Sequence, residues 1–381
     1  MADSLLALDV GDASIEALLL EGGSHVRFYQ RVELSDGVVM DGAIVNEEKF
    51  ISALTSLAEG CKKQIGGLRR GLLPTALNFP ESKIFIYCFD VGLIAGSDRE
   101  KIIRAEAEKI IPWQEQEIYF DFIAKKDKET NHVLYVAAPK KLVNDYQRAC
   151  ASAGFDLVAI GAESLSLGQA LLSAGEPHGA TLILDIGART TNISIFDKDD
   201  LLALSVSVPI AGQIFSQAIA RDKGLSLPEA EALKRKGENL CTPDISTAYP
   251  SLFSSFEELA QEVQKAVVYF EKKTKEIVTA VVLAGGSSLL IGFDVFWGNK
   301  LGRKTSIGDP LKKVSNPDAL HDGGAAIFFA DVIGLALSAR DSKAEQINLL
   351  RRATLPDKIS GSRSGVDLKI MFHRFFSRGK K

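Results

Sequence analysis

Short apolar runs, each ending at a polar turn, recur along both halves of the chain. In the first half, the runs at 5–10, 14–21 and 24–34 have the length and the flanking residues of strands. A helical segment follows at about 47–64, and a further strand at 72–79. The first half therefore predicts three strands, one helix and one strand.

The second half repeats this order. Its predicted elements are, in chain order, strands at 181–186, 190–196 and 201–210, helices at about 212–236 and 252–276, and a strand at 279–285. A repeated order of elements over so much of a chain indicates an internal structural repeat. We therefore expect an α/β protein built from two related lobes.

A third block, roughly 80–155, separates the two halves. Its predicted elements are strands at 83–90, 117–126 and 132–139 and helices at 98–111 and about 140–153. This alternation predicts a small α/β subdomain inserted between the halves.

The first strand of each half ends in a similar loop. The stretch "SLLALDVGDAS" places Asp9 at a strand end, and "TLILDIGARTT" does the same with Asp185. The N–H groups of such a turn can hold an anion, and the glycine two residues after each aspartate allows close backbone approach. A carboxylate at the strand end can hold a hydrated Mg²⁺ that also binds phosphate. Two such loops facing each other predict a clamp for a polyphosphate.

A third loop supports the clamp. In "VVLAGGSSLLIGF" (281–293) a strand ends at Gly285 and Gly286, and a helix begins after them. Paired glycines let the backbone pack flat against a nucleoside. Each loop by itself is better explained as a tight turn, but three at matching places in a repeated topology favour a nucleotide site.

Composition and charge narrow the class of protein. Of the 381 residues, 46% are hydrophobic and 25% charged, as in ordinary globular proteins, and the four scattered cysteines predict reduced thiols rather than disulfides or a zinc site. We expect neither a signal peptide nor a membrane-spanning run. The net charge of −4 combines about +7 over 351–381 with about −11 over the rest, and the acidic body argues against nucleic-acid binding.

The three loops resemble the phosphate-1, phosphate-2 and adenosine motifs of the actin–Hsp70–sugar-kinase superfamily. Over about 4–340 the chain resembles the PilM family of actin-like proteins of type IV pilus assembly and, more distantly, the FtsA family of cell division. Four stretches carry this resemblance, namely "AEAEKIIPWQEQEIYFDF" (105–122), "VLYVAAPKKLVNDYQRACASAGFDLVAIGAES" (133–164), "GLSLPEAEALKRKGE" (224–238) and "LAQEVQKAVVYFEKK" (259–273).

The resemblance implies a duplicated actin-like, ribonuclease H-like α/β fold with a nucleotide cleft between two lobes. Its parts would be 1–80 and 156–178 as the first lobe (1A), 81–155 as the inserted subdomain (1C), 179–212 and 278–340 as the second-lobe core (2A), 213–277 as its subdomain (2B), and 341–381 as a basic tail with an amphipathic helix.

The resemblance also implies site residues. These are Asp9 and Asp185 as Mg²⁺-associated carboxylates, Gly11, Asp12, Ala13, Ser14, Gly187, Ala188, Arg189, Thr190 and Thr191 around the phosphates, and Gly285, Gly286 and Ser287 along the adenosine. Glu231 and Lys234 match positions that contact the ribose or adenine, or form a solvated helix pair. Glu163 matches a residue that orients the attacking water, or is a carboxylate favoured by a helix N-terminus.

Two departures from the family pattern bear on chemistry. Glu16 stands where relatives carry a phosphate-binding lysine, and Arg189 stands where they carry glycine or serine. Arg189 either supplies the missing cation from the opposite loop or points away from it. Ser287 replaces the third glycine of the adenosine motif, a mild change. These departures put ATP turnover in doubt more than the fold.

The resemblance therefore implies a cytoplasmic scaffold of type IV pilus assembly, or of the related type II secretion, at the inner face of the cytoplasmic membrane. It would bind ATP or ADP with Mg²⁺, with slow or absent hydrolysis. The resemblance implies an inner-membrane partner resembling PilN and self-association into rings or filaments. The alternatives are an FtsA-like division tether and a small-molecule kinase of the same superfamily, which would need a general base beside an acceptor pocket.

The end of the chain holds two further signals. "EQINLLRR" (345–352) resembles the segment by which PilN docks, so it is expected to dock in cis or onto a second copy, or to pack on the second lobe as a last strand or coil. In 366–381, the residues that share one helical face, with basic residues outside it, are Leu368, Met371, Phe372, Phe375 and Phe376. This predicts an amphipathic helix that lies on an anionic membrane surface or, alternatively, packs on the second lobe.

Overall fold

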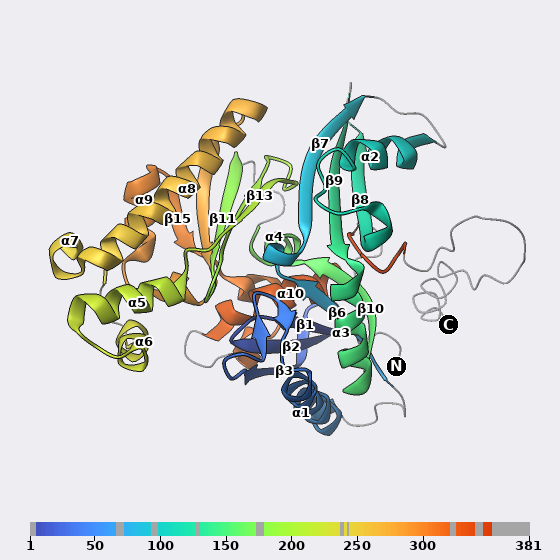
Figure 1. Cartoon of the computed structure of the whole chain (residues 1–381), viewed down its shortest axis with the longest axis horizontal. Coiled ribbons are helices and arrows are strands. Elements are labelled where there is room, and N and C mark those ends of the chain that lie inside the picture. The colour runs from blue at the N-terminus through green and yellow to red at the C-terminus, as the bar shows by residue number, and fades with distance from the viewer. Residues whose placement is uncertain are drawn as a thin grey trace, which may run out of the picture.

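The computed structural model describes most of the chain. The described residues are 5–65, 72–92, 98–126, 130–172, 179–236, 240–241, 244–320, 325–339 and 346–352. Within them, there are two five-stranded sheets and a third sheet of three strands. In Figure 1 the first five-stranded sheet lies at the lower centre, the second stands above it to the left, and the three-stranded sheet stands above it to the right.

The first sheet has the strand order β10-β6-β1-β2-β3. Its strands are β1 (Leu6–Val10), β2 (Ser14–Glu21), β3 (His25–Glu33), β6 (Leu73–Phe79) and β10 (Phe155–Ala162). β1, β2 and β3 form an antiparallel meander, whereas β6 pairs in parallel with β1 and β10 with β6. The short strands β4 (Val39–Met40) and β5 (Ala43–Ile44) form a separate hairpin.

The second sheet repeats this topology in the order β13-β12-β11-β14-β15. Its strands are β11 (Ala180–Ile186), β12 (Thr191–Phe196), β13 (Leu202–Val208), β14 (Val278–Ala284) and β15 (Lys304–Ile307). β11, β12 and β13 again form the antiparallel meander, and β14 and β15 pair in parallel. The predicted duplication of one α/β unit is confirmed.

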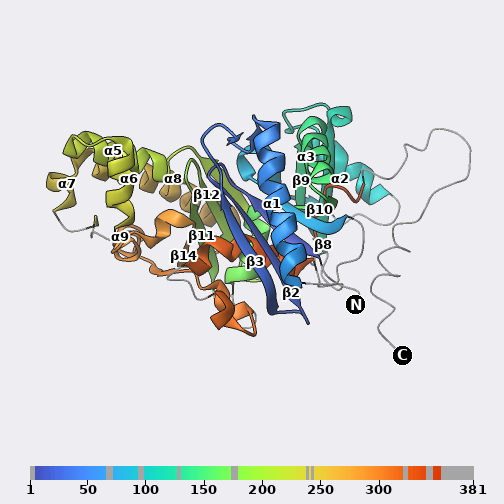
Figure 2. The same cartoon turned by 90° about the horizontal axis from the view of Figure 1, so that it is seen from below.

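Helices cover both sheets and give each lobe its own core. Those of the first lobe are α1 (Glu47–Ile65), α3 (Lys140–Ser152) and α4 (Glu163–Leu171), and those of the second are α5 (Gly212–Lys223), α6 (Leu227–Arg235), α7 (Ile245–Ala248), α8 (Pro250–Thr274) and α9 (Phe293–Leu301). Alternation of buried and exposed positions lets α1 and α8 each place one apolar face on a sheet. Figure 2 shows α5 and α6 at one end of the molecule and α3 at the other.

One predicted helix is wrong in detail. The single helix expected over 212–236 is two helices, α5 and α6. Gly224 ends α5 in the left-handed conformation, with φ of 66°. Ser226 and Glu229 then form a capping box that starts α6 in a new direction.

The inserted block forms the antiparallel sheet β7-β9-β8. Its elements are β7 (Phe85–Gly92), α2 (Arg99–Ala107), β8 (Ile118–Lys126) and β9 (Thr130–Pro139). The buried face of α3, which follows β9, packs in the core of the first lobe with α1 and β10. The insert also reaches the second lobe, because the Cys88 thiol of β7 donates to the carbonyl of Leu202 on β13 at 3.2 Å.

Two helices cross where the lobes meet. α10 (Ala330–Ser338) follows the second-lobe strands in sequence, but it packs on β1, β2 and β6 of the first sheet and on α4. A Cβ at Gly334 would lie 1.8 Å from the carbonyl oxygen of Ser166 in α4. Glycine at this position therefore lets the two helix backbones touch.

Residues 346–352 pack on the first lobe in cis, with Ile347, Leu349 and Leu350 buried in its core. The alternative that this stretch packs on the second lobe is wrong. The predicted amphipathic helix over 366–381 lies outside the described residues. In the described part of the chain, none of the helices is long and apolar enough to cross a membrane.

Candidate functional site

The two predicted loops have the same geometry. Gly11 N donates to the carbonyl of Ser14 at 3.0 Å, and Gly187 N donates to that of Thr190 at 3.0 Å. Each loop is thus the tight turn of a hairpin, β1–β2 in one lobe and β11–β12 in the other. Asp9 and Asp185 occupy equivalent positions on the strands that enter these turns.

The loops face each other and touch. Arg189 Nε of the second loop lies 3.0 Å from Asp12 Oδ2 of the first, an ion-pair distance. The backbone N–H groups of Asp41 and Gly42 also donate to the Asp12 carboxylate, at 2.9 and 3.0 Å. Arg189 therefore reaches across to the opposite loop, and Asp12 fixes where its guanidinium lies.

Carboxylates gather behind the loops. Three of them are partly exposed, namely Asp9, Asp185 and Glu163. Asp331 of α10 and the buried Glu81 also belong to this group. Burial, followed by the charges of Glu16 and Asp185, holds the pKa of Asp9 well above its ordinary value. Burial and then the charge of Glu81 raise the pKa of Asp185 to about 7. One oxygen of Asp9 and one of Asp331 are buried without a hydrogen-bond partner.

Glu163 is the first residue of α4, and Asn192 Nδ2 donates to its carboxylate at 3.1 Å. Burial and the charges of Asp9, Asp185 and Glu81 raise its pKa well above the ordinary value. The helix N-terminus favours a carboxylate here, as expected for the structural alternative. Its place near the paired loops is also compatible with the predicted role in orienting water.

A second cation beside the first loop is Arg31, which was not predicted from the sequence. Strand register places Arg31 of β3 directly opposite Glu16 of β2, and Arg31 Nε lies 2.7 Å from Glu16 Oε1. The Arg31 guanidinium lies over the ring of Phe328, 4.4 Å from its centroid. Arg31 therefore pairs with Glu16 within the first lobe, so that Glu16 does not present an unpaired negative charge beside the first loop.

Two of the hydroxyl side chains expected around the phosphates form hydrogen bonds within the protein. The Ser14 hydroxyl donates to Glu16 at 2.7 Å, and the buried Thr191 hydroxyl donates to the carbonyl of Ile210 at 2.6 Å. Both hydroxyls therefore hold the loops in shape. The backbone of the second loop is fixed as well, since Gly212 N and Gln213 N at the start of α5 donate to the carbonyls of Gly187 and Ala188. Thr190 stays partly exposed beside them.

The third loop lies against the second. Gly285 has φ of 75°, and a Cβ there would lie 2.4 Å from Asp185 Oδ1, so the backbone itself requires glycine. A Cβ at Gly286 would lie 2.9 Å from the Phe328 ring. The Ser287 hydroxyl is 3.5 Å from the carbonyl of Gly187. The predicted adenosine loop and second phosphate loop are therefore in direct contact.

Glu231 and Lys234 join this neighbourhood as a pair on α6. Lys234 Nζ lies 2.8 Å from Glu231 Oε2 and donates to Ser216 Oγ and to the carbonyl of Gly212, each at 2.8 Å. Partial burial acts to raise the pKa of Glu231, but hydrogen bonds from Lys234, Ser216 and Arg235 outweigh it and bring the pKa to about 2. The pair is thus an ordered ion pair that ties α6 to α5, rather than a solvated one.

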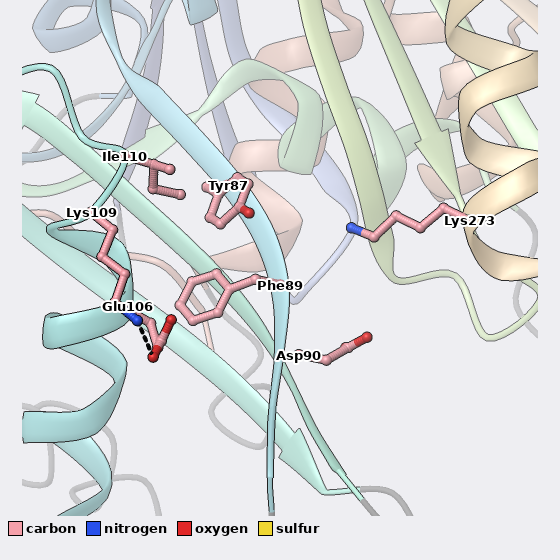
Figure 3. Close-up of a pocket in the computed structure, with 7 residues that line it drawn as sticks. All are labelled: Tyr87, Phe89, Asp90, Glu106, Lys109, Ile110 and Lys273. Carbon is pink, nitrogen blue, oxygen red and sulfur yellow. Dashed lines mark hydrogen bonds and ion pairs between the residues drawn. The ribbon is translucent and has the colours of Figure 1, made fainter.

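A separate hollow of about 350 Å³ lies on the inserted subdomain (Figure 3). Tyr87 and Phe89 of β7, Ile110 after α2, and Lys273 of α8 are among its lining residues. Lys273 Nζ donates to the carbonyl of Cys88 at 3.3 Å and so links α8 to β7. None of the predicted nucleotide residues lines this hollow.

The donor set fits a magnesium ion that arrives with a nucleotide. No group of three or more His, Cys, Asp or Glu side chains in the described ranges is arranged to hold a metal ion. Mg²⁺ usually keeps several waters and is held by one or two carboxylates together with substrate phosphates. Asp9, with one unpartnered buried oxygen, and Asp185 can supply those carboxylates.

Three further residues of the site were missed from sequence. Asp331 is an acidic residue inside the apolar stretch "IFFADVIGLAL" (327–337), a signal that was available. Glu81 bridges the lobes, since Ser164 N of α4 and Ser205 Oγ of β13 donate to its two oxygens at 3.0 and 2.9 Å. Arg31 gave no signal, because strand register cannot be read from a single strand.

The buried Glu81 carboxyl predicts a pH-dependent stability. Burial raises its pKa from an ordinary value of 4.5, against hydrogen bonds from Ser164 and Ser205 that lower it. A raised pKa in the folded state contributes stability that is complete below the ordinary value and is lost as pH rises through the folded value. The Glu81→Gln variant, which carries no charge and keeps an acceptor for Ser164 N, should therefore lose less stability than the wild type between pH 5 and pH 8.

Thermal unfolding measured at pH 5, 6, 7 and 8 without nucleotide checks this. The melting curves of the exposed control Glu59→Gln should track those of the wild type at every pH. If the melting temperatures of Glu81→Gln and the wild type changed in parallel with pH, the Glu81 carboxyl would not be the cause of the pH dependence of stability.

Comparisons with known proteins agree with this geometry. A family model described as type IV pilus assembly protein PilM matches residues 7–339. The cell division protein FtsA of Bacillus subtilis (strain 168) is 22% identical over an alignment of 221 residues, and the match covers 51% of this chain and 49% of FtsA. The chain therefore spans about half the length of this curated relative.

Solved structures share the fold. The PilM–PilN type IV pilus biogenesis complex matches with a TM-score of 0.76 at 22% identity, over 89% of this chain and 99% of that chain. EutJ from Carboxydothermus hydrogenoformans matches with a TM-score of 0.56 at 16% identity, over 88% of this chain and 90% of that chain. MreB5 of Spiroplasma citri bound to AMPPNP matches with a TM-score of 0.51 at 15% identity, over 88% of this chain and 95% of that chain. The family model matches most of the chain. The chain therefore belongs to the PilM family of type IV pilus assembly proteins.

Proposed function

We propose that this chain is an ATP-binding scaffold of type IV pilus assembly that docks an inner-membrane partner resembling PilN. The observation that carries the nucleotide part is the pair of matching hairpin loops, each preceded by an aspartate, that meet through Asp12 and Arg189. The partner is proposed because the matching solved structure is a PilM–PilN complex.

The first loop supports the approach of a phosphate. Gly11 does not have a positive φ, and a Cβ there would meet the Ser14 carbonyl oxygen at 3.5 Å, an ordinary contact. The protein itself therefore does not require glycine at this position. A ligand that comes close to the backbone is the remaining reason for a residue without a side chain.

Mg²⁺ would be held with the nucleotide by Asp9 and Asp185, neutralising charge on the phosphates.

A scaffold fits the site better than a small-molecule kinase. A kinase needs a general base within reach of an acceptor pocket. The hollow on the inserted subdomain is lined by Asp90 and Glu106, whereas the paired loops and Glu163 lie elsewhere. We therefore propose that the chain does not phosphorylate a small molecule. Hydrolysis is proposed to be slow or absent because Glu16 stands where relatives carry a phosphate-binding lysine. The FtsA match supports a division tether as the second candidate, and co-purification with pilus or with division proteins distinguishes the two.

Calorimetry of the unaltered chain tests nucleotide binding directly. Mg-ATP should bind with one-site stoichiometry, and ATP with EDTA should bind more weakly. A chain that gives no heat and no thermal shift with Mg-ATP would refute the nucleotide part of the proposal, while leaving its family and fold unchanged.

Arg189→Ala is expected to weaken ATP binding by about tenfold while changing adenosine binding little. A charge-assisted hydrogen bond to phosphate is worth about 1.5–3 kcal/mol, and adenosine carries no phosphate. Competition binding with both ligands measures the two affinities, and Arg27→Ala on the outer part of β3 serves as the exposed arginine control. Equal losses for both ligands would show that Arg189 does not contact the phosphates.

We also propose membrane attachment through residues 366–381, on the sequence pattern alone. The chain should sediment with anionic liposomes, less so at high salt, because each basic residue near such a surface contributes about 1 kcal/mol. Phe372→Asp combined with Phe375→Asp should abolish sedimentation, whereas Ser377→Asp should keep most of it. A chain truncated at 365 that still sediments fully would exclude this anchor.

A further inference from the structure

An ion pair between the lobes joins the two loops that are predicted to hold phosphate. Asp12 lies in the turn between β1 and β2 of the first lobe, and Arg189 lies in the turn between β11 and β12 of the second. Arg189 Nε is 3.0 Å from Asp12 Oδ2, and the Asp12 side chain is 12% exposed. The guanidinium thus meets a largely buried carboxylate at the point where the sequence predicts a phosphate between the loops.

The Asp12 carboxylate has hydrogen bonds of its own, apart from Arg189. Its Oδ2 accepts from Asp41 N at 2.9 Å, and its Oδ1 accepts from Gly42 N at 3.0 Å. Both N–H groups belong to the turn between β4 and β5. A carboxylate that accepts two backbone N–H groups stays hydrogen-bonded when a cation leaves it. Opening the ion pair therefore does not leave Asp12 without partners.

The turn that holds Asp12 is itself anchored in the first lobe. The buried Tyr146 hydroxyl of α3 donates to the carbonyl of Gly42 at 3.0 Å. On the other side of the turn, Lys83 Nζ lies 2.6 Å from Asp41 Oδ2. These contacts fix the Asp12 carboxylate relative to the first loop. Its negative charge therefore stays in place when a ligand enters between the loops.

Arg189 does not use all of its hydrogen-bonding capacity on Asp12. Among the described residues, its buried Nε has no hydrogen-bond partner, although it lies at ion-pair distance from Asp12. A guanidinium has five N–H donors and can grip two phosphate oxygens at once, and such charge-assisted hydrogen bonds are strong. Arg189 therefore gains hydrogen bonds when it moves from Asp12 to a phosphate.

Asp12 also opposes the ligand directly. Glu16, the acidic side chain that follows the first loop on β2, has its own cation in the same lobe, because Arg31 Nε lies 2.7 Å away. Asp12 instead takes its cation from the opposite loop. Once a phosphate has taken Arg189, two like charges lie side by side and repel each other. Asp12 thus competes for the cation and repels the anion that replaces it.

We propose that Asp12 is an internal competitor of the nucleotide phosphates. In the nucleotide-free protein it holds Arg189 as a phosphate would and ties the two loops together, and a nucleotide binds tightly only by taking Arg189 from it. This explains an arginine at a position where the family pattern has glycine or serine. The inference rests on the proposed nucleotide-binding function and names the residue that regulates it.

Neutral variants of the full chain test the proposal. Asp12→Asn and Asp12→Ser keep a hydrogen-bond acceptor but carry no charge, so in calorimetry both should bind Mg-ATP at least tenfold more tightly than the wild type. Adenosine carries no phosphate and should bind all three proteins within twofold. Without nucleotide, both variants should melt at a lower temperature than the wild type. A purely structural residue would lower the stability without raising the affinity.

Lys83→Met is the matched control. It removes the ion pair with Asp41 on the other side of the same turn but leaves the charge of Asp12 in place. Its Mg-ATP affinity should stay within twofold of the wild type. Arg189→Ala completes a double-mutant cycle. The loss of Mg-ATP affinity that it causes should be at least threefold larger in Asp12→Asn than in the wild type, because Arg189 no longer has to leave Asp12.

The outcomes distinguish this inference from the nucleotide proposal. If the wild type binds Mg-ATP and both neutral variants bind it no more tightly, the inference is wrong and the nucleotide site stands. If neither the wild type nor the neutral variants bind Mg-ATP, while circular dichroism shows all three folded, both proposals are wrong. Binding by the neutral variants alone would support the inference, since Asp12 would then keep the wild-type site empty. Tighter adenosine binding by the variants would contradict it, because the effect would not act through phosphate.

Discussion

Replacing Gly334 by alanine should destabilise this protein more than any other single methyl group added to its described glycines. The new Cβ would lie 1.8 Å from the carbonyl oxygen of Ser166 and 2.5 Å from its carbonyl carbon. Both atoms belong to the backbone of α4, so no side chain can rotate away. Overpacking typically costs 1–3 kcal/mol, and we expect about 3 kcal/mol or more here, after any gain in helix propensity.

Gly298 of α9 is the matched control. It is also a helical glycine, but a Cβ there would meet its nearest neighbour, the carbonyl oxygen of Arg303, at 3.6 Å. Gly298→Ala should therefore be neutral or stabilise the protein by up to about 1 kcal/mol. Urea unfolding of both variants measures the difference. A Gly334→Ala protein as stable as Gly298→Ala would show that α4 and α10 do not touch as described.

Asp185→Asn should weaken Mg-ATP binding tenfold or more while raising the stability of the ligand-free protein at pH 8. Tenfold corresponds to about 1.4 kcal/mol for the loss of one metal-associated carboxylate. The stability should rise because burial and the charge of Glu81 raise the pKa of Asp185 to about 7, so its ionised form is unfavourable in the fold. Opposite signs for stability and affinity separate a functional carboxylate from a structural one.

Calorimetry with Mg-ATP and thermal unfolding at pH 8 measure the two quantities. ATP in EDTA should bind the variant as well as it binds the wild type, because no metal is present to lose its ligand. Asp156→Asn is the control, since Asp156 is exposed on β10 and pairs with Pro74, near the start of β6. Unchanged Mg-ATP affinity in Asp185→Asn would remove this residue from the metal site.

The order of elements was available from sequence because it rests on local pattern. The alternation of apolar and polar residues in 14–21 or 47–64 reports which face of a strand or helix is buried, and this does not depend on distant residues. The repeated strand–Asp–x–Gly turn then identified the duplication. The break between α5 and α6 was equally local, in Gly224 and in the capping box of Ser226, and was missed only because the helical pattern resumes after it.

The tertiary structure decided the contacts between residues that are distant in sequence. Asp12 meets Arg189, Glu16 meets Arg31, Gly334 meets Ser166, and Asp121 meets Arg352. Each depends on strand register or on the placement of one lobe against another, and a one-residue slip in register would separate the partners. Local burial patterns by themselves carry no information about such pairings. Sequence therefore determined the two lobes and the loops at their centre, while packing decided which charges the loops meet and where the chain's own "INLL" segment packs.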